Sequence, residues 1–250
     1  MKYLKFLYNN KEQYGKFVDG KIHILCGNFL ETQEESGEIV DEKDVKILAP
    51  TKPSKIVCVG LNYVTHAKEL GQERPVRPLI FLKPPTTVIG YKDKIKKPSI
   101  CERLDYEGEL GVVIGKRCKD IKPEEAKDYI FGFTCLNDVT ARDITILDGQ
   151  WTRGKSFDTF CPIGPYVETE LDYNNAHVKT ILNGEVKQDD TTKNFVHNVD
   201  KVISFISSAM TLEVGDVIAT GTPHGISPMK HGDEIIIEIE GIGRLINTID

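Results

Sequence analysis

Two glutamates separated by one glycine begin an apolar segment that has the composition of a buried β-strand. The segment is DYEGELGVVI, residues 105–114, and the pair is Glu107 and Glu109. Side chains at alternate strand positions point to the same face, about 6.5–7 Å apart. Two carboxylates held that close repel each other unless a cation lies between them. The segment therefore predicts a strand that presents a carboxylate pair to a cation.

A third carboxylate, Asp138, ends the next apolar run, FGFTCLN at residues 131–137. Three oxygen ligands without a supporting Cys or His favour a hard cation such as Mg²⁺ or Mn²⁺. We therefore predict Glu107, Glu109 and Asp138 as the metal ligands. The competing interpretation is that the glutamate pair lies on a solvated strand face.

The composition is that of a globular protein and excludes several classes. The chain has 250 residues, 40% hydrophobic and 28% charged, and its net charge of −6 leaves no basic stripe for a nucleic acid.

Its six cysteines form no C-x-x-C motif, so we expect reduced core thiols rather than a zinc or iron–sulfur site; a catalytic cysteine is the alternative. No apolar run reaches the roughly 18–20 residues that span a bilayer, and the N-terminus lacks a signal-peptide core, so we expect a cytoplasmic protein without a membrane partner.

The residue pattern of the chain changes near residue 50. Residues 1–50 predict a small β-rich domain with strands at 2–8 and 21–25, and an acidic surface loop or short helix at 33–46. Prolines at 50 and 53 interrupt regular structure, so we place the boundary there and expect a larger domain at 54–250. Strands outnumber helices in that part, which predicts a mainly β, α+β fold.

Several elements of the larger domain carry clear signals. Apolar runs predict strands at 55–60, 79–83, 216–220 and 234–239, and Asn183-Gly184 predicts a type I′ hairpin over 180–187. We expect one or two helical turns at 62–70, a helix opening at Pro123, and a helix at 199–210.

Two residues in the helical turns form a candidate general base. His66 and Glu69 are three residues apart, which places them on one helical face. A carboxylate beside an imidazole fixes its tautomer and raises its basicity. The alternative is a surface His–Glu pair without a function.

Three further residues have side chains suited to a bound acid. Arg142 offers paired hydrogen bonds to a substrate carboxylate, and Lys155 offers a point charge to a developing oxyanion. Thr222 supplies a hydroxyl within a glycine-rich turn that follows a strand. The alternatives are that Lys155 is a surface lysine and that Thr222 lies in an ordinary β-turn.

These segments, taken in order, resemble the fumarylacetoacetate hydrolase family. The matching pieces are GLNYVTHAKE, FLKP, DYEGELGVVIGK, NDVTARD, GKSFD and TGTPHG, and they extend over residues 54–246. The resemblance is closest to compact bacterial and archaeal members and to the branch of acylpyruvate hydrolases, oxaloacetate decarboxylases and 2-hydroxyhepta-2,4-diene-1,7-dioate isomerases.

The resemblance implies a β-roll with a mixed sheet, a homodimer, and Mg²⁺ or Mn²⁺ held by the three carboxylates. It also implies that His66 and Glu69 form a catalytic dyad on a lid segment that orders when substrate binds. Lys155 would stabilise an enolate or oxyanion, and Arg142 and Thr222 would line the substrate pocket. Two positions depart from the family pattern. Leu61 stands where some acylpyruvate hydrolases have arginine, and Thr145 stands where many members have glutamine, so the substrate is less defined than the metal site.

We therefore expect a Mg²⁺- or Mn²⁺-dependent enzyme that acts on 2-oxo or β-diketo acids through a metal-chelated enolate. Hydrolysis of a C–C bond in an acylpyruvate-like substrate is the favoured reaction. The alternatives are isomerisation of 2-hydroxyhepta-2,4-diene-1,7-dioate, and decarboxylation or tautomerisation of oxaloacetate. Outside enzymes, the alternatives are a catalytically silent binding module of the same fold and a calcium-binding structural protein, although the chain lacks the D-x-D-x-D-G loop of many calcium sites.

Overall fold

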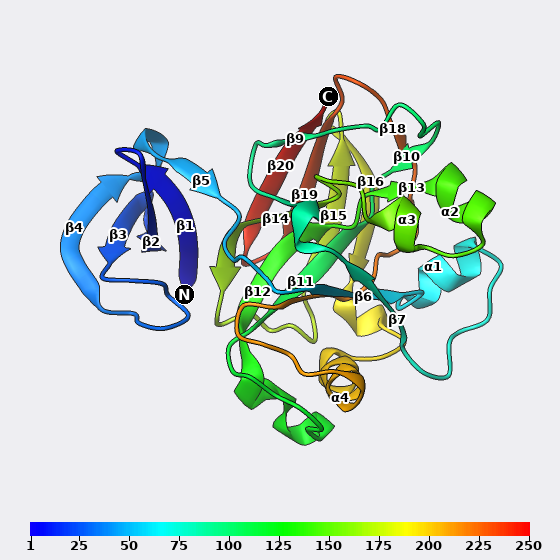
Figure 1. The fold of residues 1–250 in the computed structure, drawn as a ribbon, viewed down its shortest axis with the longest axis horizontal. Helices are drawn as coiled ribbons and strands as arrows, with labels where there is room; N and C mark the ends of the chain where they lie inside the picture. The colour runs from blue at the N-terminus through cyan, green and yellow to red at the C-terminus, as the bar shows by residue number, and fades with distance from the viewer.

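The computed structural model describes residues 1–250, and β-strands dominate it (Figure 1). The strands form a long mixed sheet, a second five-stranded sheet and a short three-stranded ribbon, with only four short α-helices. The predicted mainly β, α+β architecture is confirmed.

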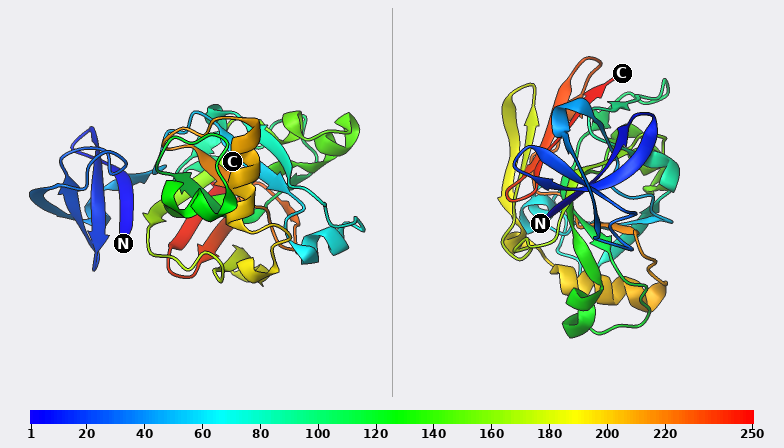
Figure 2. Two further views of the ribbon diagram at one scale, coloured as in Figure 1. Left: turned by 90° about the horizontal axis from the view of Figure 1, so that it is seen from below. Right: turned by 90° about the vertical axis from the view of Figure 1, so that its left-hand side faces the viewer.

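The N-terminal strands form a lobe that lies to one side of the rest of the chain (Figures 1 and 2). Two-residue turns join the first three strands, and Asn9, Asn10, Asp19 and Gly20 in these turns all adopt the positive φ angles that such hairpins require. The strands are β1 (Lys2–Tyr8), β2 (Lys11–Val18), β3 (Lys21–Leu25), β4 (Glu35–Asp41) and β5 (Lys46–Leu48). β1 also pairs with β14, so the lobe continues the main sheet.

The expectation of a loop or short helix over residues 33–46 is wrong. Residues Glu35–Asp41 form edge strand β4, and only Glu42–Asp44 form a 3₁₀ turn, η1. Six of the seven β4 side chains are exposed, so no apolar alternation marks the strand. Backbone pairing with β3 holds it in place, and among its side chains Val40 packs against the core of the lobe.

The main sheet has the strand order β4-β3-β2-β1-β14-β12-β11-β17-β6-β7, with β5 beside β1 and β8 beside β14. β17 and β6 pair in parallel, whereas β11 and β12 form an antiparallel pair at its centre. The remaining strands of this sheet are β6 (Ile56–Gly60), β7 (Leu79–Lys83), β8 (Val88–Ile89), β11 (Gly108–Ile114), β12 (Ile130–Asn137), β14 (Cys161–Glu168) and β17 (Val217–Ala219).

The second sheet packs against the main sheet and closes the principal core. Its order is β16-β15-β19-β20-β9. Alternate residues of β19, Ile235, Ile237 and Ile239, are buried in one cluster with Leu110 and Val112 of β11. Its strands are β9 (Lys94–Ile95), β15 (His177–Leu182), β16 (Glu185–Thr191), β19 (Glu234–Ile239) and β20 (Gly243–Ile249); the short ribbon contains β10 (Leu104–Asp105), β13 (Thr140–Ala141) and β18 (Pro228–Met229).

Three of the four α-helices gather on the side of the molecule away from the N-terminal lobe (Figure 1). These are α1 (Val64–Glu69), α2 (Arg142–Asp148) and α3 (Thr152–Lys155), whereas α4 (Val199–Ala209) covers one end of the main sheet. The element predicted from Pro123 is a 3₁₀ helix, η3 (Pro123–Tyr129), and two more short turns are η2 (Pro85–Thr87) and η4 (Thr192–Asn194). No helix has the length and apolar character needed to cross a membrane.

Candidate active site

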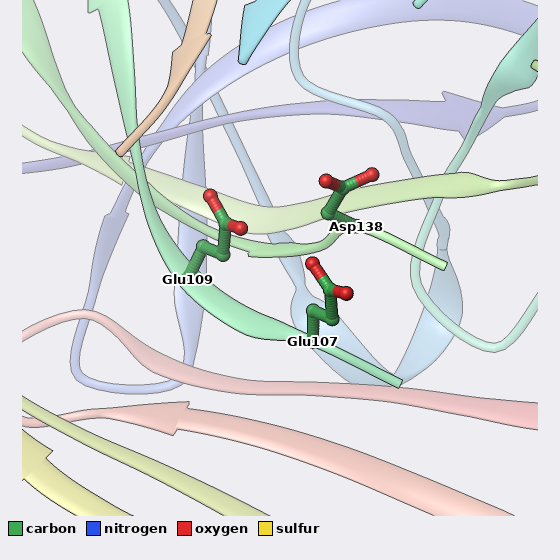
Figure 3. Close-up of side chains that lie close together, drawn as sticks. All are labelled: Glu107, Glu109 and Asp138. Carbon is green, nitrogen blue, oxygen red and sulfur yellow. The ribbon is translucent and has the colours of Figure 1, made fainter. Parts of the chain in front are cut away.

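The three carboxylates singled out in the sequence converge at one end of the β11–β12 pair. Glu107 immediately precedes β11, Glu109 lies within it, and Asp138 immediately follows β12. Gly108 pairs with Asn137, which brings the three neighbouring positions to the same end of the two strands. One oxygen from each carboxylate lies within 4.8 Å of the others, and all three residues are buried (Figure 3).

Buried cations surround two of these carboxylates. The Lys155 ammonium donates to Glu107 Oε2 at 2.7 Å and to Asp138 Oδ2 at 2.6 Å. Lys83, at the end of β7, pairs with the other oxygen of Asp138 and donates to the carbonyl of Val139 at 3.0 Å. Arg142, at the start of α2, pairs with Glu107 and also donates to Asp105 Oδ2 at 3.0 Å.

Glu109 differs because it contacts no cationic side chain. Its Oε2 accepts the backbone N–H of Gly221 at 2.7 Å. Asp105 pairs with Arg103 and Arg142, Glu107 with Arg142 and Lys155, and Asp138 with Lys83 and Lys155, so Glu109 is the one carboxylate of the cluster without a cationic partner.

The electrostatic consequences differ between the carboxylates. Burial raises the pKa of Glu109 well above its ordinary value, and the neighbouring Asp138 and Glu107 raise it further. Burial opposes ionisation of Glu107 too, but Lys155 and Arg142 outweigh it and lower the pKa of Glu107. Burial likewise disfavours the charged form of Lys155, yet Asp138 and Glu107 raise its pKa, so it remains an ammonium.

The donor set fits a hard divalent cation. Three buried carboxylates bring their oxygens together, no His or Cys belongs to the set, and the carboxylate of Glu109 lacks a charge partner. A divalent ion among them would offset the like-charge repulsion that disfavours ionised Glu109.

His66 and Glu69 meet as their spacing on α1 predicts. His66 Nδ1 lies 2.8 Å from Glu69 Oε2, and Glu69 Oε1 accepts the backbone N–H of Gly225 at 2.9 Å. The Thr65 hydroxyl donates to Asp190 Oδ2 at 2.9 Å, which ties α1 to β16. The His66 ring is buried, and these contacts leave its Nε2 as the nitrogen without a protein partner.

One cavity of about 230 Å³ connects these groups. Seven of the eight residues predicted for the site line it: His66, Glu107, Glu109, Asp138, Arg142, Lys155 and Thr222. Glu69 does not line the cavity and acts on it only through His66. Leu61 and Thr145, the two departures from the family pattern, line it as well.

Two predicted substrate-binding groups already have protein partners. The Arg142 guanidinium is held by Asp105 and Glu107. The Thr222 hydroxyl donates to the carbonyl of Gly108 at 2.9 Å and accepts from Gln188 Nε2 at 2.8 Å. Both residues border the cavity, but in this structure their polar groups hold strand ends and carboxylates in place.

Several residues of the site could not be assigned to it from the sequence. Lys83 and Asp105 complete the buried charge cluster, and Phe81 and Trp151 form an aromatic wall of the cavity. A lysine that ends an apolar strand, as in the FLKP segment, was the one available signal. The pairing of Asp105 with Arg142, 37 residues apart, follows from the tertiary fold alone.

The cysteines do not supply a nucleophile to the cavity. Five of the six are buried, Cys26 is exposed, and none lines the cavity. Burial raises the pKa of Cys161 to about 12, which keeps it a thiol at neutral pH.

Comparison with known proteins decides the family. The model of the fumarylacetoacetate (FAA) hydrolase C-terminal family matches residues 55–250, and the Rv2993c-like N-terminal model matches residues 1–50. The chain belongs to the fumarylacetoacetate hydrolase family. The resemblance drawn from the six sequence segments is thereby confirmed, and the chain is a member of a family of enzymes.

Relatives of this chain are named for different enzymatic activities. The oxaloacetate tautomerase YisK of Bacillus subtilis is 42% identical over 221 residues, which cover 82% of this chain and 73% of that protein. The crystal structure of 5-carboxymethyl-2-hydroxymuconate delta-isomerase from Mycobacterium smegmatis matches with a TM-score of 0.94 and 37% identity, covering 100% and 99% of the two chains. Maleylpyruvate hydrolase from Sphingobium sp. SYK-6, solved with manganese(II) and pyruvate, matches with a TM-score of 0.83 and 26% identity, covering 100% and 98%.

Proposed function

We propose that this protein is a Mg²⁺- or Mn²⁺-dependent enzyme that hydrolyses a C–C bond in an acylpyruvate-like β-diketo acid. The observation that carries the proposal is the lining of the cavity: three buried carboxylates with one oxygen each within 4.8 Å of the others, and His66, whose Nδ1 is held by Glu69. The first feature suits a divalent ion, and the second suits a base that activates water.

Glu107, Glu109 and Asp138 are the residues that would hold the ion. When bound, the ion would act as a Lewis acid for the carboxylate and 2-oxo oxygens of the substrate. Lys83, Lys155 and Arg142 fix the orientation of two of these carboxylates before any ion arrives. Such preorganisation lowers the cost of assembling the site.

His66 is the proposed general base. Its Nδ1 is occupied by Glu69, so Nε2 accepts a proton from water, and the water oxygen forms a bond to the distal carbonyl carbon. The Lys155 ammonium stabilises the negative charge that develops on that carbonyl oxygen. The C–C bond then breaks, its electron pair goes to C3 of the pyruvyl unit, and His66 returns the proton to C3. The products are pyruvate and a carboxylic acid.

Tautomerisation of oxaloacetate is the second candidate, and the name of the Bacillus subtilis relative favours it. This reaction needs only proton transfer to and from C3, which His66 Nε2 can perform without adding water. Both reactions use the same carboxylates and the same base, so the geometry of the charged groups does not separate them.

A product assay separates the two candidates. The protein is incubated with Mg²⁺ and, separately, with acetylpyruvate, oxaloacetate and 2-hydroxyhepta-2,4-diene-1,7-dioate, while NMR follows the products. We expect acetylpyruvate to give equimolar acetate and pyruvate, with the reaction abolished by EDTA. Accelerated keto–enol exchange of oxaloacetate with intact acetylpyruvate would favour the tautomerase, and absence of Mg²⁺-dependent turnover of all three would contradict the proposed chemistry.

A further inference from the structure

The lining of the cavity combines two kinds of side chain. The charged groups are the three carboxylates with Lys155, Arg142 and His66. Six lining residues are apolar and are called the apolar wall here: Val59, Leu61, Leu70, Phe81, Ile146 and Trp151. A substrate that places its 2-oxo acid among the charged groups therefore meets the apolar wall with its distal end.

The apolar wall is rigid where the aromatic rings meet. Phe81 and Trp151 pack edge to face with ring centroids 5.2 Å apart, and the Trp151 ring covers Gly60, where an added Cβ would approach it to 2.6 Å. The Lys155 ammonium lies 5.1 Å from the centroid of the Phe81 ring, so the wall begins directly beside the charged groups. A short distal group already reaches it.

The lysine and the arginine of the cavity already have carboxylate partners. Lys155 is held by Glu107 and Asp138, and Arg142 by Glu107 and Asp105. His66 Nδ1 is held by Glu69, and the proposed mechanism uses its Nε2 for the attacking water. The other polar residues there, Gln72, Thr145 and Thr222, are uncharged. The Thr145 hydroxyl already donates to the carbonyl of Arg142 at 2.8 Å, and the Thr222 hydroxyl donates to that of Gly108 at 2.9 Å. A carboxylate buried against the apolar wall would lose its hydration without gaining a partner, which is strongly unfavourable.

Two further arginines lie beside the cavity but do not line it. Arg74 and Arg77 line a neighbouring hollow that shares only Leu61 and Gln72 with it. The exposed Val76 stands between them in the sequence, so this segment presents both charge and apolar surface to solvent.

We propose that the natural substrate is a 2-oxo acid whose distal group is uncharged and apolar, and that the apolar wall selects it over substrates with a second carboxylate. This inference rests on the proposed function, because it assumes that the 2-oxo acid end is bound at the carboxylate cluster. It separates this protein from an enzyme for oxaloacetate or a dienoic diacid, both of which carry a distal carboxylate.

Two stable ligands of nearly equal shape test the selection. 5-Methyl-2-oxohexanoate and 2-oxoglutarate share the 2-oxo acid end. The distal group is an isopropyl group in the first and a carboxylate in the second. Calorimetric titration of the Mg²⁺-loaded protein should give a dissociation constant at least about 10-fold lower for 5-methyl-2-oxohexanoate. Equal or tighter binding of 2-oxoglutarate would overturn this inference alone, whereas binding of neither ligand would contradict the proposed function and this inference with it.

A pair of neighbouring surface residues supplies a matched variant and control. Ile146 and Leu147 of α2 are 75% and 79% exposed, but only Ile146 lines the cavity, so an arginine at either position should leave the fold intact. Ile146→Arg should shift the affinity ratio by about 10-fold or more toward 2-oxoglutarate, because it supplies the missing cation. Leu147→Arg should keep the wild-type ratio. A wild-type ratio in folded Ile146→Arg, or an equal shift in both variants, would contradict contact between the distal group and the apolar wall.

Discussion

His66 and Glu69 are joined on one turn of α1 by a 2.8 Å contact between Nδ1 and Oε2, and the second oxygen of Glu69 is bound to the backbone of Gly225. The imidazole is therefore oriented from two parts of the chain that lie far apart in sequence. His66 borders the cavity that the carboxylates line, and its Nε2 has no protein partner.

The first prediction concerns this pair. His66→Ala should lower the rate of acetylpyruvate hydrolysis by about 10²–10⁴-fold, because the base for water is lost, while Mn²⁺ affinity stays at the wild-type value. The N-terminal lobe offers a matched control, since His23 Nδ1 lies 3.0 Å from Glu35 Oε2 far from the cavity. His23→Ala should keep full turnover, and a near-normal rate in His66→Ala would exclude the pair from the mechanism.

Lys83 should contribute strongly to stability. Its side chain is 0% exposed and its partner Asp138 is 1% exposed. Lys83→Met leaves one oxygen of that buried carboxylate without its cation, so the free energy of unfolding should fall by about 3 kcal/mol in denaturant titrations. The exposed pair of Lys94 and Asp250 is the control, because Lys94→Met should change little. Equal effects of the two substitutions would show that the buried pair adds nothing.

Gly154→Ala should impair the site through packing. An added Cβ would lie 2.4 Å from Thr145 Cγ2 and 2.8 Å from the carbonyl oxygen of Ala141. α3 would have to move away from α2, and the adjacent Lys155 with it, so we expect a loss of about 1–3 kcal/mol in stability and a clear drop in turnover. Gly149→Ala tests the specificity of this effect, because no atom lies within 4 Å of an added Cβ there, although its φ of 65° favours glycine. Retention of wild-type turnover in Gly154→Ala would contradict this packing account.

Asp143 should give acid-dependent stability. Burial alone would raise its pKa, but the backbone N–H groups of Glu102 and Arg103 outweigh it and lower the pKa below the ordinary 3.8. A lowered pKa in the folded state means that the contribution is present above pH 3.8 and is lost as the pH falls below it. The stability difference between wild type and Asp143→Asn, measured in denaturant, should therefore shrink below pH 3.8. A difference that stays constant from pH 6 to pH 2.5 would contradict this assignment.

The sequence predicted the elements that consist of apolar runs or are bounded by turn signals. The strands at 2–8, 21–25, 79–83 and 234–239 and the Asn183-Gly184 hairpin are confirmed. β4 escaped prediction because it is an edge strand with mostly exposed residues, so no apolar pattern marks it. The division into domains at 1–50 and 54–250 stays a prediction, as does the homodimer.

The candidate site was predictable only where residues are close in sequence or follow strands. The spacing of Glu107, Glu109 and Asp138 indicated their convergence, and the spacing of His66 and Glu69 indicated their contact. Contacts between distant segments left no local signal. The bond from Gly225 to Glu69 and the packing of Trp151 over Gly60 depend on the tertiary arrangement, so no local pattern could reveal them.

The central claim is that three acidic side chains bind one divalent ion, and calorimetric titration of the EDTA-treated protein with Mn²⁺ tests it most directly. We expect the wild type to bind one ion per chain. Glu109→Ala should bind the ion at least about 100-fold more weakly. The exposed Glu213 supplies a control variant, Glu213→Ala, that should bind as the wild type does. Absence of binding to the wild type, or an unchanged affinity in Glu109→Ala, would contradict the account.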